Sequence, residues 1–452
     1  MPVPLTKAVG EFVSNLRYED IPKPVIPTVH TGFTDCVGVL IGGAREPAAQ
    51  LLKSTLAPAG RESSVLFDGS RTSAPDAAWI NGTAAHAMDF DDVALNMWGH
   101  PSTVLVPAIL AEAEAIDASG RDMVVAYVAG YETWAELVRR DRDLYIPKGW
   151  HPTGLFGALG AAAACASLLK LHPEQAATAV SIAASKAAGL AANWGTMTKP
   201  FHAGCAAQSG VIAARLAKAG FTASLDTLER QAGFLSAISP AGRFDAESPI
   251  ELGRDWKLIR NGLHIKKYPL CFATHRALDG ILDVLQSHDV DAKGVTRVTV
   301  STCPRGVQQL RYSKPQLGLE AKFSMEFAMA SALIARRAGL TELSDDFVQR
   351  PDVQSLMDKV VVTPDEREDP ALPGWAIYDQ VTIESKAGRV ESARVNTVRG
   401  GPEAPIRPTE LWAKFQSCLE AGSAAIPSRP LFDSLMSLDR LPRASALPGI
   451  GA

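Results

Sequence analysis

Apolar residues recur every three or four positions along the first 260 or so residues, a spacing that places them on one face of a helix. Glycine, proline, serine and aspartate stand at the expected helix ends. Several of these segments are rich in alanine, which permits close helix packing, so an all-helical domain is expected. The predicted helices span 27–42, 75–88, 103–117, 121–140, 155–170, 173–190, 204–219 and 224–236.

The pattern changes after Pro269, where apolar and polar residues alternate and β-branched residues become frequent. Alternation with a period of two predicts strands at residues 295–303, 359–364 and 377–395, with a hairpin turn at the Lys-Ala-Gly-Arg stretch 386–389. Helices predicted at 273–288 and 321–338 would pack against one face of the resulting sheet. A smaller α+β domain is the expected result.

Helical periodicity returns after residue 400, in 409–422 and 429–438. These helices are expected to rejoin the first helical domain. The predicted fold is therefore mainly α, with a large discontinuous all-helical domain and a smaller inserted α+β domain. The predicted boundaries are 1–264 and 401–452 for the helical domain and 265–400 for the α+β domain.

Composition narrows the class of protein. The 452 residues are 46% apolar, which allows a large buried core. The 45 basic and 49 acidic residues are scattered, so no basic stripe is available and nucleic-acid binding is not expected. Apolar stretches such as 155–171 are rich in alanine and glycine and shorter than the roughly 20 residues of a membrane span, so no membrane association is expected.

The remaining compositional signals point to a reducing compartment and to no familiar cofactor. The six cysteines are widely spaced and form no Cys-x-x-Cys pair, so reduced thiols are expected. The opening residues carry a Lys and a Glu where a secretory signal has a clean apolar run, and a cytoplasmic location is expected. The sequence has no Gly-x-Gly-x-x-Gly motif after a strand, no Walker-type Gly-Lys-Ser/Thr and no Gly-x-Ser-x-Gly motif. Dehydrogenase, kinase and hydrolase interpretations therefore lose their usual support.

Histidines are the first candidates for chemistry, because their unperturbed pKa of about 6.5 suits proton transfer near neutral pH. The sequence has nine. Five of them lie in segments dense in polar residues, glycine or proline within otherwise apolar sequence: His86, His100, His151, His202 and His275.

The segment 86–102 concentrates acids and histidines. Asp89, Asp91 and Asp92 follow a predicted helix, and His100 stands where the next one begins. Helix capping or a solvated loop would explain the acids, but an aspartate can also fix the tautomer of a histidine for proton transfer. A metal site is the rival interpretation, although the spacing fits no standard ligand pattern.

Further candidates lie at two helix N-termini and at a predicted domain junction. His151 precedes Pro-Thr-Gly at a helix start, where unpaired backbone N–H groups favour a carboxylate. Lys199 and His202 open another helix after a loop that carries Thr198; a surface lysine is the ordinary explanation, but Lys199 is also suited to bind a substrate carboxylate. Lys266 stands in a Lys-Lys-Tyr-Pro string at the junction, where clefts commonly hold ligands. Together these residues indicate a cluster suited to an anionic substrate.

Six strings in order along the chain resemble the MmgE/PrpD family: Asn-Gly-Thr-Ala-Ala-His-Ala-Met-Asp-Phe-Asp-Asp from residue 81, Gly-His-Pro-Ser from 99, Trp-His-Pro-Thr-Gly from 150, Gly-Thr-Met-Thr-Lys-Pro-Phe-His-Ala-Gly from 195, Lys-Lys-Tyr-Pro from 266 and Ala-Lys-Phe-Ser-Met-Glu-Phe from 321. The resemblance implies a helical domain built from both ends of the chain, a smaller α+β lid and a homodimer. It also implies a small polycarboxylate substrate and addition or removal of a proton beside a carboxylate, with neither cofactor nor metal.

The resemblance also implies roles for particular residues. Family active-site positions are matched by Asp89, His100, His151, Lys199, His202 and Lys266, and Tyr145 resembles a tyrosine of the epimerase branch. The two lysines, helped by Thr198 and by N–H groups near His151, are expected to bind the carboxylates. His100, oriented by Asp89, is expected to move the proton.

The motifs also bear on the reaction. The family's cis-aconitate decarboxylases have a threonine where this chain has Val93, and the strings around His100, His151 and Lys199 look most like the iminodisuccinate epimerase branch. An epimerase is therefore the first expectation. The alternatives are a 2-methylcitrate or citrate dehydratase, a cis-aconitate decarboxylase, and a non-catalytic polycarboxylate-binding protein.

Overall fold

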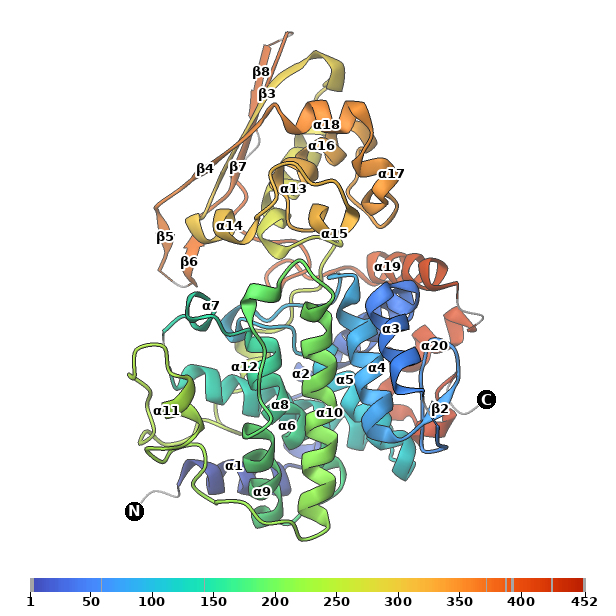
Figure 1. Ribbon diagram of the computed structural model, residues 1–452, viewed down its shortest axis with the longest axis vertical. Helices are drawn as coiled ribbons and strands as arrows, with labels where there is room; N and C mark the ends of the chain where they lie inside the picture. The colour runs from blue at the N-terminus through green and yellow to red at the C-terminus, as the bar shows by residue number, and fades with distance from the viewer. Residues whose placement is uncertain are drawn as a thin grey trace. The chain divides into compact units, whose positions relative to one another are not determined.

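The computed structural model describes residues 4–57, 59–141, 143–370, 372–386, 388–391, 394–423 and 426–449, and its ribbon is drawn in Figure 1. The chain forms two compact units. The first contains the residues up to Leu263 together with those from Arg407 onward, and the second is His264–Ile406.

The first unit is helical apart from a two-stranded ribbon of β1 (Ser63–Ser64) and β2 (Arg71–Thr72). Its N-terminal part contains α1 (Leu5–Asn15), α2 (Val25–Gly42), α3 (Pro47–Leu56), α4 (Ala74–Ala87), α5 (Ser102–Ile116), α6 (Gly120–Arg139), α7 (Tyr145–Lys148), α8 (Pro152–Leu168), α9 (Pro173–Ala184), α10 (Thr198–Lys218), α11 (Phe234–Ile238) and α12 (Lys257–Arg260). The C-terminal part adds α19 (Pro408–Gly422) and α20 (Ser428–Leu435), and α19 packs against α2.

Small residues allow the central helices α4, α8 and α10 to lie very close together. A Cβ added at Gly204 of α10 would stand 2.3 Å from the carbonyl oxygen of Trp79 in α4. One added at Gly210 would stand 2.3 Å from the Cβ of Ala161 in α8. Real Cβ contacts are never this short, so glycine is required at both positions. Every residue of α8 is buried, as the apolar character of all its faces predicts.

The apolar helix α2 lies in this core. Together with the turn after it (Val25–Arg45), it is long and apolar enough to cross a membrane by length and composition alone. Its most apolar window is 78% buried, and α2 packs against α4, α5 and α19. Burial of this kind is what a core helix of a folded domain shows.

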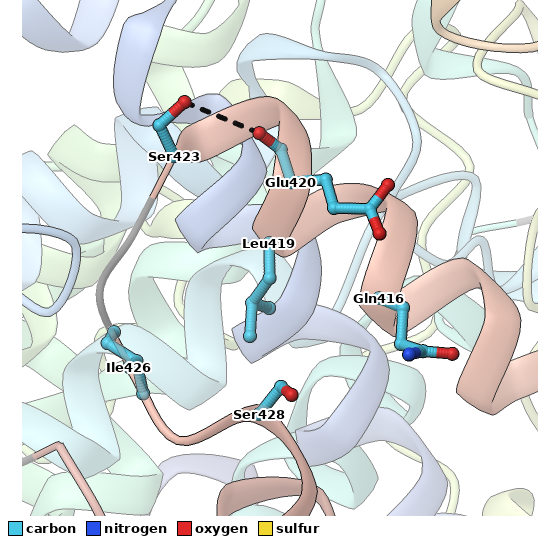
Figure 2. A pocket seen from close by; sticks show the side chains of 6 residues that line it. All are labelled: Gln416, Leu419, Glu420, Ser423, Ile426 and Ser428. Carbon is cyan, nitrogen blue, oxygen red and sulfur yellow. Dashed lines mark hydrogen bonds between the residues drawn. The ribbon is translucent and has the colours of Figure 1, made fainter.

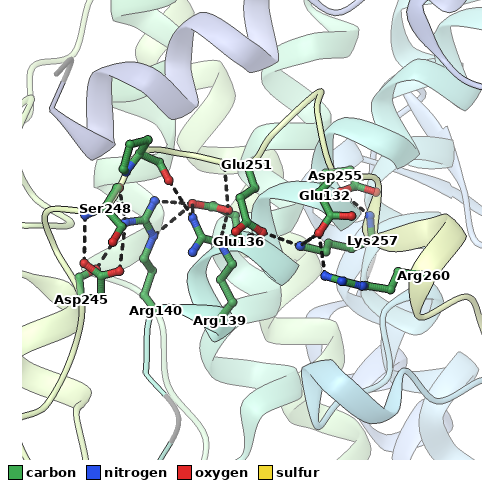
Figure 3. Close-up of polar contacts among 11 residues, drawn as sticks. Glu132, Glu136, Arg139, Arg140, Asp245, Ser248, Glu251, Asp255, Lys257 and Arg260 are labelled. Atoms are coloured by element: carbon green, nitrogen blue, oxygen red, sulfur yellow. Dashed lines mark hydrogen bonds and ion pairs between the residues drawn. The ribbon is translucent and has the colours of Figure 1, made fainter. Parts of the chain in front are cut away.

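Buried charged groups fasten the segment before Leu263 to α6 (Figure 3). Glu136 forms ion pairs with Arg139 and Arg140. The carboxylate of Glu132 accepts hydrogen bonds from the backbone N–H groups of Lys257 and Leu258, at 3.0 and 2.9 Å. These two amides open the short helix α12, so Glu132 satisfies donors that would otherwise be buried without acceptors.

The second unit is an α+β structure. Its main sheet has the order β4-β3-β7-β8, formed by β3 (Val295–Thr302), β4 (Val360–Pro364), β7 (Gln380–Ser385) and β8 (Gly388–Glu391). The β3–β4 pair is parallel, and the other two pairs are antiparallel. A small ribbon pairs β5 (Glu368–Asp369) with β6 (Leu372–Ala376).

The helices of this unit gather on one face of the main sheet (Figure 1). They are α13 (His275–Ser287), α14 (Pro304–Gln309), α15 (Gly318–Ala321), α16 (Met325–Ala335), α17 (Asp345–Val348) and α18 (Pro351–Met357). Val298 and Val300 of β3, Ile281 of α13 and Phe327 of α16 share one buried core. The predicted fold class, mainly α with a smaller α+β part, is confirmed.

Most predicted elements are present, and two differ from the prediction. Residues 224–236 form turns, with a helix only at Phe234–Ile238, because hydrogen bonds from side chains to the backbone compete with helix formation. The hydroxyls of Ser181 and Thr227 both donate to the carbonyl of Ser224, at 2.9 Å. The helix predicted at 173–190 ends at Ala184. The predicted hairpin pairs Ser385 with Gly388, and Ala387 of its turn lies outside the described residues.

Candidate active site

Four histidines of the first unit form a contiguous row. His86 lies near the end of α4, and His202 lies in the first turns of α10. His151 directly precedes α8, and His100 stands two residues before α5. The ring centroids are 4.5 Å apart for His100 and His86, 6.0 Å for His86 and His151, and 5.3 Å for His151 and His202. The close packing of α4, α8 and α10 therefore brings together histidines that are far apart in the sequence.

One carboxylate orients the first two rings. Asp91 accepts hydrogen bonds from the Nδ1 of His86 at 2.9 Å and from the Nδ1 of His100 at 2.9 Å. Burial alone would raise the pKa of Asp91, but the two histidines outweigh burial and hold that pKa well below its usual value. An ionised carboxylate only accepts hydrogen bonds. Both imidazoles therefore carry a proton on Nδ1 and, when neutral, a lone pair on Nε2.

The environments of these two rings differ. His86 is fully buried, and burial is the main reason that its pKa falls to about 3. The side chain of His100 is 14% exposed, so it can meet solvent or a ligand. Its Nδ1 also lies 2.8 Å from the carbonyl oxygen of Asp92, and its backbone N–H donates to the hydroxyl of Thr153 in α8. His100 is held in place from both sides of its loop.

The other two histidines form a hydrogen-bonded pair. The Nδ1 atoms of His151 and His202 lie 3.0 Å apart, so one donates and the other accepts. Burial, followed by the positive charge of Lys199, lowers the pKa of His151 well below its usual value and that of His202 to about 4. The edge-to-face contact of His151 with Trp194 completes this part of the row. Both rings are neutral near pH 7.

A lysine and an aspartate stand beside the row. The Nζ of Lys199 lies 2.6 Å from Oδ1 of Asp89, with the side chains only 8% and 6% exposed. Asp89 has a φ of +52°, in the left-handed region that aspartate tolerates better than most residues. This backbone conformation turns the chain sharply after α4. Asp89 and Asp91, only two positions apart, thereby serve different partners.

Buried polar groups hold the Asp-Phe-Asp-Asp string itself. The carboxyl group of Asp92 is hydrogen-bonded to the hydroxyl and the backbone N–H of Ser102, and burial raises its pKa to about 8. Lys414 of α19 donates to the carbonyl of Phe90 at 2.7 Å and forms an ion pair with Asp35 of α2. The C-terminal part of the chain therefore helps to position the site.

The site also contains a possible set of metal ligands. Among the described residues, one group of histidine and acidic ligand atoms, from His86, Asp89, Asp91 and His100, lies within 4.8 Å of one another. Asp91 already accepts two imidazole N–H groups, and Asp89 is paired with the ammonium group of Lys199. A cation would compete with these partners, so the donor set fits hydrogen bonding and proton transfer better than a resident metal.

The structure brings together most of the predicted site residues and changes one pairing. The carboxylate hydrogen-bonded to Nδ1 of His100 is that of Asp91, whereas we expected Asp89 to orient His100. The sequence contained the signal for Asp91, which was one of three neighbouring candidates. The role of His86 was missed, because nothing in the sequence shows that it shares an acceptor with His100.

Three predicted residues lie apart from these contacts. The ring of Tyr145 packs edge-on against Phe156, and its hydroxyl has no hydrogen-bond partner among the described residues. Burial, then Asp141 and Asp143, raises its pKa. Thr198 is half-buried at the start of α10, where its backbone N–H donates to the hydroxyl of Thr196. Lys266 is buried and belongs to the second unit.

A surface pocket of about 220 Å³ lies elsewhere in the first unit, beside the end of α19 (Figure 2). It is lined by Gln416, Leu419, Glu420, Ser423, Ile426 and Ser428. None of these residues belongs to the histidine row, and Glu420 is the one ionisable group among them. This single carboxylate has no histidine or lysine beside it in the lining, so the pocket lacks the cluster of acid–base groups found in the histidine row.

Comparison with known proteins agrees with the resemblance seen in the motifs. Residues 7–247 match the MmgE/PrpD N-terminal domain, and residues 268–426 match the MmgE/PrpD C-terminal domain. A human cis-aconitate decarboxylase is 30% identical over 360 residues, which cover 75% of this chain and 72% of that protein. A cis-aconitate decarboxylase of Aspergillus terreus is 27% identical over 470 residues, which cover 97% and 94% of the two chains. Both domain matches, in order and covering most of the chain, show that the chain belongs to the MmgE/PrpD family.

Proposed function

We propose that the chain is a lyase of the MmgE/PrpD family that acts beside a carboxylate of a small polycarboxylic acid, with cis-aconitate as the first substrate to test. The names of its relatives from human and Aspergillus terreus support this choice. Decarboxylation thus replaces epimerisation as our first candidate. Other acids should be tested as well, because this chain has Val93 at the position where a decarboxylase is expected to have a threonine.

One observation carries the proposal: a buried cation and an oriented imidazole stand in the same small group. The ammonium group of Lys199 contacts Asp89, and an oxygen of Asp89 lies within 4.8 Å of a ring nitrogen of His100. Lys199 can bind a substrate carboxylate, and His100 can transfer a proton to or from the adjacent carbon. Oriented charges in a water-poor site and a positioned acid or base each contribute about two to four powers of ten in rate.

The proposed decarboxylation needs one proton. The bond between carbon and a carboxylate breaks, CO2 leaves without charge, and the electron pair remains on the substrate. The negative charge that develops on the remaining carboxylates is stabilised by Lys199. A proton from the site is then transferred to the substrate carbon skeleton, so that the product contains one hydrogen in place of the lost carboxylate.

Binding of the substrate can promote protonation of a histidine in the site. In the structure, His151 and His202 have lowered pKa values, caused by burial and then by the charge of Lys199. A bound polyanion opposes the second cause, because its negative charge counteracts that of Lys199 beside the rings. Its binding therefore favours uptake of a proton by one of these imidazoles, which supplies the histidine row with the proton that His100 transfers.

A substrate panel tests the proposal. Purified protein is incubated in D2O with cis-aconitate, 2-methylcitrate, citrate and iminodisuccinate, and the products are followed by proton NMR. We expect loss of CO2 from cis-aconitate, with one deuterium in the product. The same assay after dialysis against a chelator should give full activity, and lost activity that returns with a metal would indicate a metal-dependent lyase. Absence of turnover for every acid, with measurable binding, would indicate a polycarboxylate-binding protein.

Epimerisation is the second candidate, because the histidines form two pairs. An epimerase needs two acid–base groups, one for each face of the carbon. The pair of His86 and His100 and the pair of His151 and His202 would supply them. Inversion of iminodisuccinate with deuterium incorporation, and no reaction of cis-aconitate, would select this function.

Two further proposals follow from the family resemblance, namely that the protein works as a homodimer and in the cytoplasm. Light scattering coupled to size-exclusion chromatography tests the first, and a mass close to twice 48.0 kDa is expected. Fractionation of cells that produce the protein tests the second.

A further inference from the structure

His86 shares its carboxylate partner with His100, the residue proposed to transfer the proton. We propose that His86 is a positioning residue: its Nδ1–H group holds the carboxylate of Asp91, so that His100 keeps a proton on Nδ1 and presents Nε2 to the substrate. The proposal deepens the proposed function and rests on it for the role of His100.

The distances support an arrangement in which His86 is the main anchor of the carboxylate. Its Nδ1 lies 3.0 Å from Oδ1 and 2.9 Å from Oδ2 of Asp91, so it contacts both oxygens. His100 contacts Oδ2 alone, at 2.9 Å. Asp91 is fully buried. It lies two residues after Asp89, whose positive φ turns the backbone. Without the N–H group of His86, the carboxylate would lose the donor that fixes both of its oxygens.

The choice of a buried histidine has a physical reason. A lysine or arginine at this position would neutralise the charge of Asp91 and weaken its interaction with His100. His86 is fully buried and stays neutral near pH 7, because burial strongly disfavours its imidazolium form. A neutral donor fixes the orientation of the carboxylate and leaves its negative charge available to His100.

The other charged and titratable groups around His100 come from three elements of the first unit. The loop after α4 supplies Asp89, Asp91 and Asp92, the start of α8 supplies His151, and α10 supplies Lys199. All of them are retained when His86 alone is replaced. A change in the titration of His100 in such a variant would therefore report the loss of the shared N–H group.

Three substitutions separate the two ring nitrogens of His86. His86→Asn places an amide N–H group where Nδ1 stands, His86→Gln places it where Nε2 stands, and His86→Leu removes both. If the role of His86 depends on Nδ1, Asn should restore function and Gln should not. A purely structural requirement for a ring-sized side chain would not distinguish the two amides in this way.

The titration of His100 can be measured without any substrate. Diethyl pyrocarbonate reacts with neutral imidazoles, and mass spectrometry of peptides gives the modification rate of each histidine as a function of pH. The exposed His172 serves as the internal standard. In His86→Leu we expect the apparent pKa of His100 to rise by about one unit, because Asp91 then interacts with His100 without the competing donor. His86→Asn should titrate like the wild type.

Turnover provides the second measurement. With the substrate identified by the NMR panel, kcat should fall about tenfold to a hundredfold in the Leu and Gln variants, with little change in KM, and Asn should restore most of it. The proposal is overturned if the pH dependence of His100 modification is the same in His86→Leu as in the wild type, or if Asn behaves like Leu. If no acid on the panel reacts, the proposed function fails while the titration still decides the role of His86.

Discussion

The buried ion pair between Lys199 and Asp89 gives a prediction whose size follows from the structure. Replacing Lys199 with methionine keeps an unbranched side chain of similar length but removes the charge. The carboxylate of Asp89, which is only 6% exposed, then loses its contact with an ammonium group. The substitution should reduce both stability and activity, and the two losses can be separated.

The expected loss of stability depends on burial. Ion pairs on the surface contribute about 0 to 1 kcal/mol, whereas removing one partner of a buried pair typically costs about 3 to 5 kcal/mol. Exposures of 8% and 6% place this pair in the second class. We therefore expect Lys199→Met to lower the free energy of unfolding of the first unit by about 3 kcal/mol or more. The reason is that the carboxylate of Asp89 remains buried and charged without its partner.

A double variant supplies the control. In Asp89→Asn, the asparagine tolerates the positive φ of this position, so backbone strain should not be added. The variant that carries both substitutions has neither charge, and it should lose less stability than either single variant. Its activity should nevertheless stay low, because the cation needed for the substrate carboxylate is absent.

Urea unfolding followed by tryptophan fluorescence is a suitable assay. Of the eight tryptophans, all except Trp375 lie in the first unit, so the signal reports mainly on the unit that contains the site. A loss below about 1 kcal/mol in Lys199→Met, as for a surface pair, would refute the argument. Strictly additive losses in the double variant would refute it as well.

Three further predictions test other buried groups. Polycarboxylate binding at pH 7 should be accompanied by proton uptake, because the pKa of His202 is lowered to about 4 by burial and then by Lys199, whose charge a bound anion counteracts. Calorimetry in buffers of different ionisation enthalpy that shows no uptake would contradict this. Asp92, with a pKa of about 8 when folded and about 4 when unfolded, stabilises the fold fully below pH 4 and loses this contribution as pH rises to about 8. The free energy of unfolding of Asp92→Asn should therefore fall less than that of the wild type between pH 5 and pH 8. Urea unfolding measured at intervals of about one pH unit tests this, and equal pH dependence of the two proteins would argue against it. Glu132→Ala should leave the backbone N–H groups of Lys257 and Leu258 without their acceptor, which costs about 1–3 kcal/mol of stability for each group. Hydrogen exchange of these two amides should be faster in Glu132→Ala than in Glu132→Gln, and equal exchange would contradict the capping role.

Hydrophobic periodicity was sufficient to predict most of the fold. The alternation in β3 matches its burial, with Val298, Val300 and Thr302 buried, whereas α5 and α6 are buried at nearly every position and were recognised as helices by their length and apolar content. The prediction was wrong at 224–236, where the apolar spacing suits a helix but the hydroxyls of Ser181 and Thr227 bind a backbone carbonyl instead. One of these hydroxyls comes from α9, so the competing bond could not be seen locally.

The candidate site was predictable as a set of residues but not as a set of pairs. The segment 86–102 carries its histidines and acids close together in sequence, which made it conspicuous. Which aspartate serves which partner depends on the positive φ of Asp89 and on Lys199, which is 110 residues away. Backbone direction at one residue and contacts over such distances are set by the packing of α4 against α10.

The most direct test of the account is the rate at which solvent deuterium enters the product of cis-aconitate in His100→Gln, with the exposed His172→Gln as the matched control. We expect the wild type and His172→Gln to incorporate deuterium from D2O at the same rate, and the His100 variant to be slower by about a hundredfold or more. A normal rate of deuterium incorporation into the product in His100→Gln, with wild-type unfolding behaviour, would show that the proton is transferred by another group.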